Sequence, residues 1–126
     1  MSKISILIVE DQAIIAYDLA SKVERLGYDV AGIIATGEEA IELARLHRPS
    51  LVLMDIQLAG EMDGIAAAQQ INREFNLPIL FLTANSDPGS DERMRMAGSV
   101  GRIMKPFDKH DIHIQIEKAL NKAIAE

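Results

Sequence analysis

The chain has 126 residues, 48% of them hydrophobic and 25% charged, which is typical of one soluble globular domain spanning residues 1–126. Acidic residues outnumber basic ones by 19 to 13, and the net charge of −6 argues against nucleic-acid binding, which requires a basic face. The absence of cysteine excludes disulfides and cysteine metal sites, and no apolar run approaches the ~20 residues that span a bilayer. We therefore expect a cytoplasmic protein without a signal peptide that contacts neither nucleic acid nor membrane.

Hydrophobic patterning divides the chain into alternating strands and helices. Short apolar runs predict strands, and apolar residues at helical spacing predict the helices between them. In chain order the pattern predicts a strand over residues 4–9, a helix over 12–26, a strand over 28–35, a helix over 36–48, a strand over 51–55, a helix over 63–76, a strand over 79–82, a helix over 87–98, a strand over 101–104 and a helix from about 108.

Local signals support several of these boundaries. Gly27 is a natural C-terminal stop for the first helix. Thr36 and Glu39 have the spacing of a capping box at the start of the second. Asp87 and Pro88 suit the N-cap and first position of the fourth.

Strict alternation of strands and helices predicts a doubly wound α/β fold. Such a chain forms a parallel sheet covered on both faces by helices, with right-handed crossovers. Two five-stranded orders are plausible, and the pattern does not choose between them.

Four predicted strands end at residues with reactive side chains. The third ends at Asp55, the first is followed by Glu10 and Asp11, the fourth by Thr83 and the fifth by Lys105. Asp55 taken alone could simply begin a turn. The recurrence of the pattern favours convergence of these groups at one edge of the sheet, with Asp55 as the reacting group.

The acidic residues point to a divalent cation. If the strand order is 2-1-3-4-5, it reverses between the first and third strands, so three carboxylates would share one crevice and repel one another. Mg²⁺ would relieve this repulsion, because it prefers oxygen ligands. Zinc is disfavoured, because His47, His110 and His113 lie on or beside predicted helices and are read as ordinary helix residues.

A metal site beside a carboxylate, a hydroxyl and an ammonium suits phosphoryl transfer. A carboxylate can attack phosphorus and form an acyl phosphate without a general base. Lys105 would neutralise phosphoryl oxygens, and Thr83 would donate a hydrogen bond to one of them.

From about Ile4 to Ala123 the chain resembles the receiver domains of response regulators in two-component signalling. The resemblance rests on five motifs in order, namely Glu10-Asp11, Asp55, Asp63-Gly64, Thr83-Ala84 and Lys105-Pro106-Phe107. It implies a flavodoxin-like (βα)5 sandwich with a five-stranded parallel sheet in the order 2-1-3-4-5.

The resemblance also implies roles for the acidic residues. Asp55 would be the phosphoacceptor, receiving phosphate from a histidine of a sensor kinase or of a phosphotransfer protein. Asp11 and Asp55 would bind Mg²⁺ with the backbone carbonyl of Gln57, and Glu10 would act through water.

Further roles are implied for the last two motifs. Lys105 would contact the phosphoryl group, and Thr83, followed by Ala84, would be the switch hydroxyl. The peptide bond between Lys105 and Pro106 would be cis. Such a domain catalyses its own phosphorylation and slow dephosphorylation, and is a switch more than a turnover enzyme.

The chain departs from the family pattern at the readout. Arg102 stands where the family usually has an aromatic switch residue, and it could pair with Asp91 or meet a partner instead. Gln57 and Asn85 occupy positions that tune phosphoryl lifetime, so no lifetime can be transferred.

Phosphorylation is expected to act on the fourth helix. It would add about −1.5 to −2 charges to the crevice and bias the element that packs least firmly. The fourth helix qualifies, because its apolar residues are mainly Met94 and Met96, one of which we expect to be exposed. Its face, with the fifth strand and last helix, is expected to bind an output protein or, after phosphorylation, a second copy.

Three other functions compete with the phosphoacceptor switch. A pseudo-receiver would keep the fold as a phosphorylation-independent interaction module, for which Arg102 is the support. A flavodoxin-like carrier is disfavoured because Glu10 and Asp11 would repel a cofactor phosphate. An acyl-phosphate phosphatase would need a second acid just after Asp55. No output domain is recognisable in these 126 residues.

Overall fold

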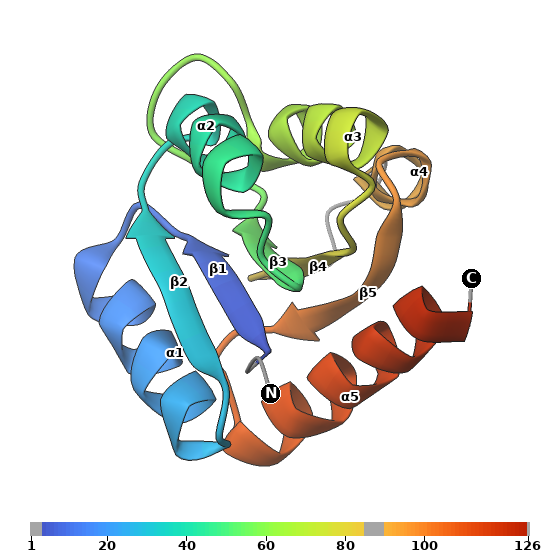
Figure 1. Cartoon of the computed structure of the whole chain (residues 1–126). Coiled ribbons are helices and arrows are strands. Elements are labelled where there is room, and N and C mark those ends of the chain that lie inside the picture. The colour runs from blue at the N-terminus through green and yellow to red at the C-terminus, as the bar shows by residue number, and fades with distance from the viewer. Residues whose placement is uncertain (1–3, 85–89, 126) are drawn as a thin grey trace.

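The computed structural model describes residues 4–84 and 90–125, in which strands and helices alternate strictly (Figure 1). The elements are β1 (Ser5–Val9), α1 (Ala13–Arg25), β2 (Asp29–Ile34), α2 (Gly37–His47), β3 (Leu51–Asp55), α3 (Gly64–Phe75), β4 (Ile79–Thr83), α4 (Ser90–Met96), β5 (Ser99–Met104) and α5 (Lys109–Ala125). Within the described ranges, no helix combines the length and apolar character needed to cross a membrane.

The sheet is parallel, and its strand order β2-β1-β3-β4-β5 confirms the order implied by the family resemblance. The order reverses between β1 and β3, so the loops that leave these two strands run to opposite sides. Val9 pairs with Met54, and Asp55 pairs with Leu82. Because the strands are parallel and in register, their carboxyl ends meet at one edge of the sheet.

Helices cover both faces of the sheet (Figure 1). On β3 and β4, Leu53 and Leu80 pack with the core residues of α1 and α5, whereas Met54 and Phe81 pack with those of α2, α3 and α4. All four of these side chains are fully buried. Burial on both faces explains why these strands read as unbroken apolar runs.

The predicted helix boundaries agree with the structure where it describes them. Gly27 follows α1 with φ of 98°, a conformation that favours glycine. The hydroxyl of Thr36 accepts a hydrogen bond from the Glu39 backbone N–H at 3.2 Å, as the capping box predicts. Asp87 and Pro88 lie outside the described residues.

One strand boundary differs from the expectation, and the expected exposure of one methionine on α4 is confirmed. β5 begins at Ser99, two residues earlier than predicted, because Ser99 pairs with Ile79 before a register shift next to Gly101. Met94 is buried, and it is Met96 that α4 exposes, at 69% of its surface.

Candidate functional site

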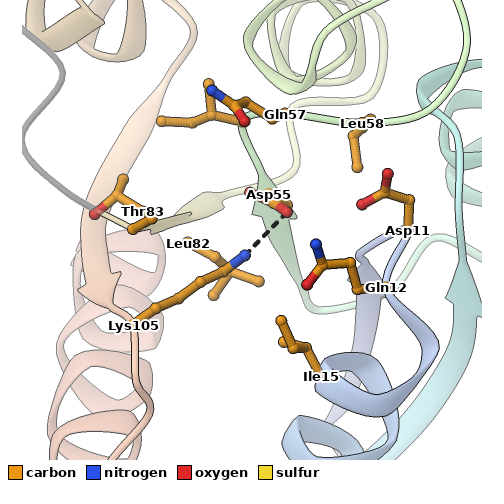
Figure 2. Close-up of a pocket in the computed structure, with 11 residues that line it drawn as sticks. Asp11, Gln12, Ile15, Asp55, Gln57, Leu58, Leu82, Thr83 and Lys105 are labelled. Carbon is orange, nitrogen blue, oxygen red and sulfur yellow. Dashed lines mark hydrogen bonds and ion pairs between the residues drawn. The ribbon is translucent and has the colours of Figure 1, made fainter.

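The carboxyl ends of β1, β3, β4 and β5 surround an open cleft of about 830 Å³ (Figure 2). Its walls contain most of the residues expected at the site and several that were not expected. The lining residues are Asp11, Gln12, Ile15, Asp55, Ile56, Gln57, Leu58, Leu82, Thr83, Ala84 and Lys105. The convergence predicted from the strand ends is therefore present in the fold.

Asp55 is positioned by a rigid backbone. It is the last residue of β3, whose preceding side chains are all fully buried, and Asp55 itself is 7% exposed. Gly64, the first residue of α3, donates its backbone N–H to the carbonyl of Ile56 at 2.7 Å. A Cβ on Gly64 would lie 1.8 Å from the carbonyl oxygen of Asp55, so only glycine allows α3 to pack this closely against the end of β3.

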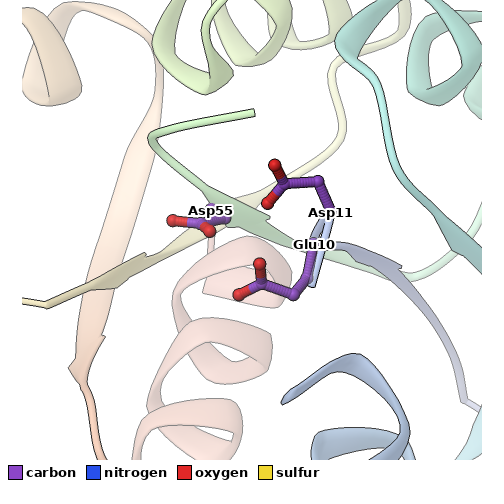
Figure 3. A group of neighbouring side chains, drawn as sticks. All are labelled: Glu10, Asp11 and Asp55. Atoms are coloured by element: carbon purple, nitrogen blue, oxygen red, sulfur yellow. The ribbon is translucent and has the colours of Figure 1, made fainter. Parts of the chain in front are cut away.

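Three carboxylates gather beside this position (Figure 3). One oxygen from each of Glu10, Asp11 and Asp55 lies within 4.8 Å of the others. Glu10 is buried, and its carboxylate accepts hydrogen bonds from the Gln12 backbone N–H at 3.1 Å and from the Lys105 ammonium at 2.8 Å. Asp11 is exposed to solvent.

The oxygens of this cluster fit a hard divalent cation. Mg²⁺ prefers oxygen ligands and keeps several of its waters, which suits a set in which Asp11 faces solvent and Asp55 lines an open cleft. The exposed Gln57 lines the same cleft and offers a backbone carbonyl. The cluster could therefore hold Mg²⁺, as the acid pattern predicted.

Lys105 supplies the positive charge at the cleft. Its ammonium donates to Glu10 at 2.8 Å and to Asp55 at 3.1 Å, the second shown as a dashed line in Figure 2. Burial alone would lower the pKa of Lys105, but these hydrogen bonds and the nearby negative charges raise it above its ordinary value. Lys105 is therefore a permanent cation at neutral pH.

The backbone around Lys105 is also fixed. Its N–H donates to the carbonyl of Thr83 at 2.8 Å, and the peptide bond to Pro106 is cis, as the resemblance implied. The hydrogen bond to Thr83 anchors the chain where it leaves β5.

Thr83 lines the cleft, but its hydroxyl is directed elsewhere. The side chain is buried, and Figure 2 shows its oxygen turned away from Asp55. The hydroxyl donates to the sulfur of Met104 on β5 at 2.9 Å. Ala84, the next residue, is exposed at the rim.

Arg102, on β5, does not line this cleft. It is exposed and lines a separate groove of about 310 Å³ with Met94, Arg95, Ser99 and Gly101. The expected pairing of Arg102 with Asp91 lies outside the described residues, because the Asp91 side chain is not described. The role expected for Asn85 also lies outside them.

The histidines occupy the positions expected for ordinary helix residues. His47 and His110 are exposed on α2 and α5, and His113 lies 3.4 Å from Glu117 on α5. None of the three lines the cleft.

Three contributors to the site were not anticipated. Gln12, whose backbone N–H holds Glu10, directly follows the acid pair, and that adjacency was the available signal. Ile15, near the start of α1, also lines the cleft. Met104 is brought to Thr83 by strand pairing, which the sequence does not reveal.

Comparison with known proteins agrees with this geometry. Residues 6–117 match the family model of the response regulator receiver domain. Over 117 residues the chain is 42% identical to the transcriptional regulatory protein PdtaR of Mycobacterium tuberculosis, covering 93% of this chain and 57% of PdtaR. It is 38% identical to the phyllosphere-induced regulator PhyR of Methylorubrum extorquens, covering 91% of this chain and 43% of PhyR.

A solved structure shows the same likeness. The signal receiver domain of a modulated diguanylate cyclase from Desulfovibrio desulfuricans superposes with a TM-score of 0.90 at 37% identity, over 96% of both chains. The present chain spans about half the length of the curated relatives that it matches.

Proposed function

We propose that this chain, which belongs to the response regulator receiver family, is a phosphoacceptor switch in which Asp55 is the nucleophile. The observation that carries the proposal is the position of Asp55. Its carboxylate lines an open cleft, accepts a hydrogen bond from the Lys105 ammonium at 3.1 Å and has two further carboxylates beside it. This set of groups suits the transfer of a phosphoryl group to a carboxylate.

Burial and contacts distinguish Asp55 from its two acidic neighbours. Glu10 has a fully buried side chain, is bonded to Gln12 and Lys105, and does not line the cleft. Asp11 faces solvent, whereas the Lys105 ammonium donates to Glu10 and Asp55. Asp55 combines access from the cleft with a direct ammonium contact, and it is therefore the residue that we assign as nucleophile.

The donor is a phosphohistidine of a sensor histidine kinase or of a phosphotransfer protein. An oxygen of Asp55 forms a bond to phosphorus while the bond between phosphorus and the imidazole nitrogen breaks, and the departing nitrogen keeps the electron pair. Lys105 would contact the incoming phosphoryl oxygens, and it remains charged because its pKa is raised. We assign the reaction to the cytoplasm.

Mg²⁺ is the proposed cofactor. Asp11, Asp55 and the backbone carbonyl of Gln57 would hold it, with Glu10 acting through water, and it would supply positive charge against the phosphoryl oxygens. The same residues would serve the slower hydrolysis of the acyl phosphate, so the domain acts as a self-limiting switch.

The switch would be read at the face formed by α4, β5 and α5. A phosphoryl group adds about −1.5 to −2 charges to the cleft. Met96 and Met104 are exposed on this face, and Arg102 is exposed on β5. We assign the binding of an output protein, or of a second phosphorylated copy, to this surface.

Labelling by a small phosphodonor tests the proposal. With acetyl phosphate and Mg²⁺, intact mass should show the gain of one phosphoryl group, which chelation of Mg²⁺ prevents. Asp55→Asn should abolish the gain. Glu61→Gln, which alters an exposed acid in the loop after Gln57, should be labelled like the parent protein. Absence of labelling in the parent chain would instead favour a phosphorylation-independent interaction module. Full labelling of Asp55→Asn would show that a residue other than Asp55 accepts the phosphoryl group.

A further inference from the structure

We propose that Met104 is a positioning residue for Thr83, and that its thioether sets how readily the Thr83 hydroxyl turns toward Asp55. The proposal rests on the phosphoacceptor function of Asp55 and goes beyond it by naming the group that opposes the switch. The observation is the 2.9 Å hydrogen bond from the Thr83 hydroxyl to the Met104 sulfur.

Strand pairing creates this contact. Thr83 ends β4 and Met104 ends β5, and the two residues are register partners in the parallel sheet. The Lys105 N–H also donates to the carbonyl of Thr83 at 2.8 Å, which fixes the two strand ends against each other. The sulfur therefore faces the hydroxyl because of the sheet itself, and the contact does not depend on a loop.

The Thr83 hydroxyl cannot donate to the Met104 sulfur and to a phosphoryl group at the same time. A threonine hydroxyl has one proton to donate, so it can serve the Met104 sulfur or a phosphoryl oxygen on Asp55, but not both at once. Thr83 is 4% exposed, so water has little access to compete for that proton. Breaking the bond to sulfur is then part of the free energy of every switching event.

The chemistry of the two acceptors predicts which of them the Thr83 hydroxyl prefers. A thioether sulfur is a weak acceptor, whereas an ionised phosphoryl oxygen accepts a stronger, charge-assisted hydrogen bond. Met104 would hold Thr83 away from Asp55 in the resting domain and release it when the phosphoryl group arrives. Because 48% of the Met104 surface is exposed, release of Thr83 would also change the exposed surface of β5 at Met104.

A double-mutant cycle with beryllofluoride, a phosphoryl mimic, tests the proposal. Met104→Leu keeps nearly the same volume but removes the acceptor. It should tighten Mg²⁺-dependent beryllofluoride binding about fivefold, the effect of one neutral hydrogen bond, as measured by titration calorimetry. In a Thr83→Val background the same substitution should leave the affinity unchanged. Leu46→Met, at an exposed position of α2 outside both the cleft and the α4–β5–α5 face, is the control and should bind like the parent.

Methyl NMR reports directly on the contact between Thr83 and Met104. In protein with labelled methionine methyl groups, Thr83→Val should shift the Met104 signal without any phosphoryl mimic, and beryllofluoride should shift it in the parent. If Met104→Leu binds beryllofluoride like the parent, or changes affinity equally in both backgrounds, the role of Met104 is overturned. If the parent binds no beryllofluoride, the phosphoacceptor function itself fails, and the role of Met104 fails with it.

Discussion

Lys105 is the residue on which the charges of the resting cleft depend. Its ammonium bridges the buried Glu10 and the nearly buried Asp55, and no other lysine or arginine lines the cleft among the described residues. Removing one member of such a group leaves the others buried without compensation, which is more costly than the net value of the pair. Lys105 therefore contributes to folding as well as to phosphoryl contact.

This dependence predicts a response to alkaline pH. The folded-state pKa of Lys105 is raised above 10.5, so the folded protein holds this proton more tightly than the unfolded chain. The resulting stabilisation is fully present below about pH 10.5 and is lost as pH rises through the folded value. The free energy of unfolding, measured by urea denaturation at a series of pH values, should therefore fall above pH 10.5.

Substitution should identify the residue responsible. In Lys105→Met the free energy of unfolding should fall less steeply over the same pH range. In Lys22→Met, which removes a half-exposed ion pair with Asp18 on α1, it should fall as in the parent protein. Some fall will remain in every variant, because burial and then Glu117 raise the pKa of Tyr28 above 10.0. An unchanged slope in Lys105→Met would contradict the coupling.

At the scale of elements, the contact between β3 and α3 decides where Asp55 lies. Asp63 caps α3 by accepting the Ala66 backbone N–H at 2.8 Å, and Gly64 then packs against the Asp55 carbonyl. The neighbouring atoms belong to the backbone, which cannot move aside as the end of a flexible side chain can. Helix α3 is therefore seated against the residue that we assign as nucleophile.

Gly64→Ala should consequently be costly. We expect a loss of about 3 kcal/mol in the free energy of unfolding, the upper range for overpacking, because the added methyl group must displace the end of β3. Urea denaturation followed by circular dichroism would measure it. The same variant should be labelled more slowly by acetyl phosphate, since Asp55 must shift.

Gly37→Ala is the matched control, because Gly37 is the first residue of α2 after its N-cap, as Gly64 is in α3. A Cβ on Gly37 would meet side chains instead, with Ala67 at 2.9 Å and Met62 at 3.3 Å. The cost should be about 1 kcal/mol. Equal losses of stability at the two positions would show that the close contact with the Asp55 backbone adds no cost of its own.

At the scale of the whole molecule, one sheet divides the core into two layers. Neighbouring residues of each central strand contribute to opposite layers, so the sheet couples α1 and α5 on one face to α2, α3 and α4 on the other. β1, β3 and β4 are almost wholly buried, whereas β5 is partly exposed. Three of the four strands that carry the cleft therefore give it a rigid base.

Damage to either layer should unfold the whole domain together. Leu80→Ala on the face of α1 and α5, and Phe81→Ala on the opposite face, should each lower the free energy of unfolding by about 3 to 4 kcal/mol. Both variants should keep a single transition, with coincident fluorescence and circular dichroism curves. Ile14→Ala, at a side chain that is 87% exposed, should change the free energy of unfolding by less than about 0.5 kcal/mol. Separate transitions would indicate that the layers unfold independently.

The sequence by itself determined the alternation of elements and the groups at the strand ends. Both follow from local physics, because burial on two faces demands apolar runs and a parallel sheet sends every strand's carboxyl end to one edge. Asp55, Glu10, Asp11, Thr83 and Lys105 could therefore be predicted from their places in the pattern. The strand order came from resemblance, because pairing between distant strands leaves no periodic signal.

Only the tertiary structure decided which contacts these residues make. The bridge from Lys105 to Glu10 and Asp55, the approach of Gly64 to the end of β3 and the bond from Thr83 to Met104 join residues distant in the chain. Such contacts depend on register and on side-chain orientation, which propensity and spacing do not encode. The sequence could place the Thr83 hydroxyl at the cleft, but only the pairing of β4 with β5 shows which acceptor it serves.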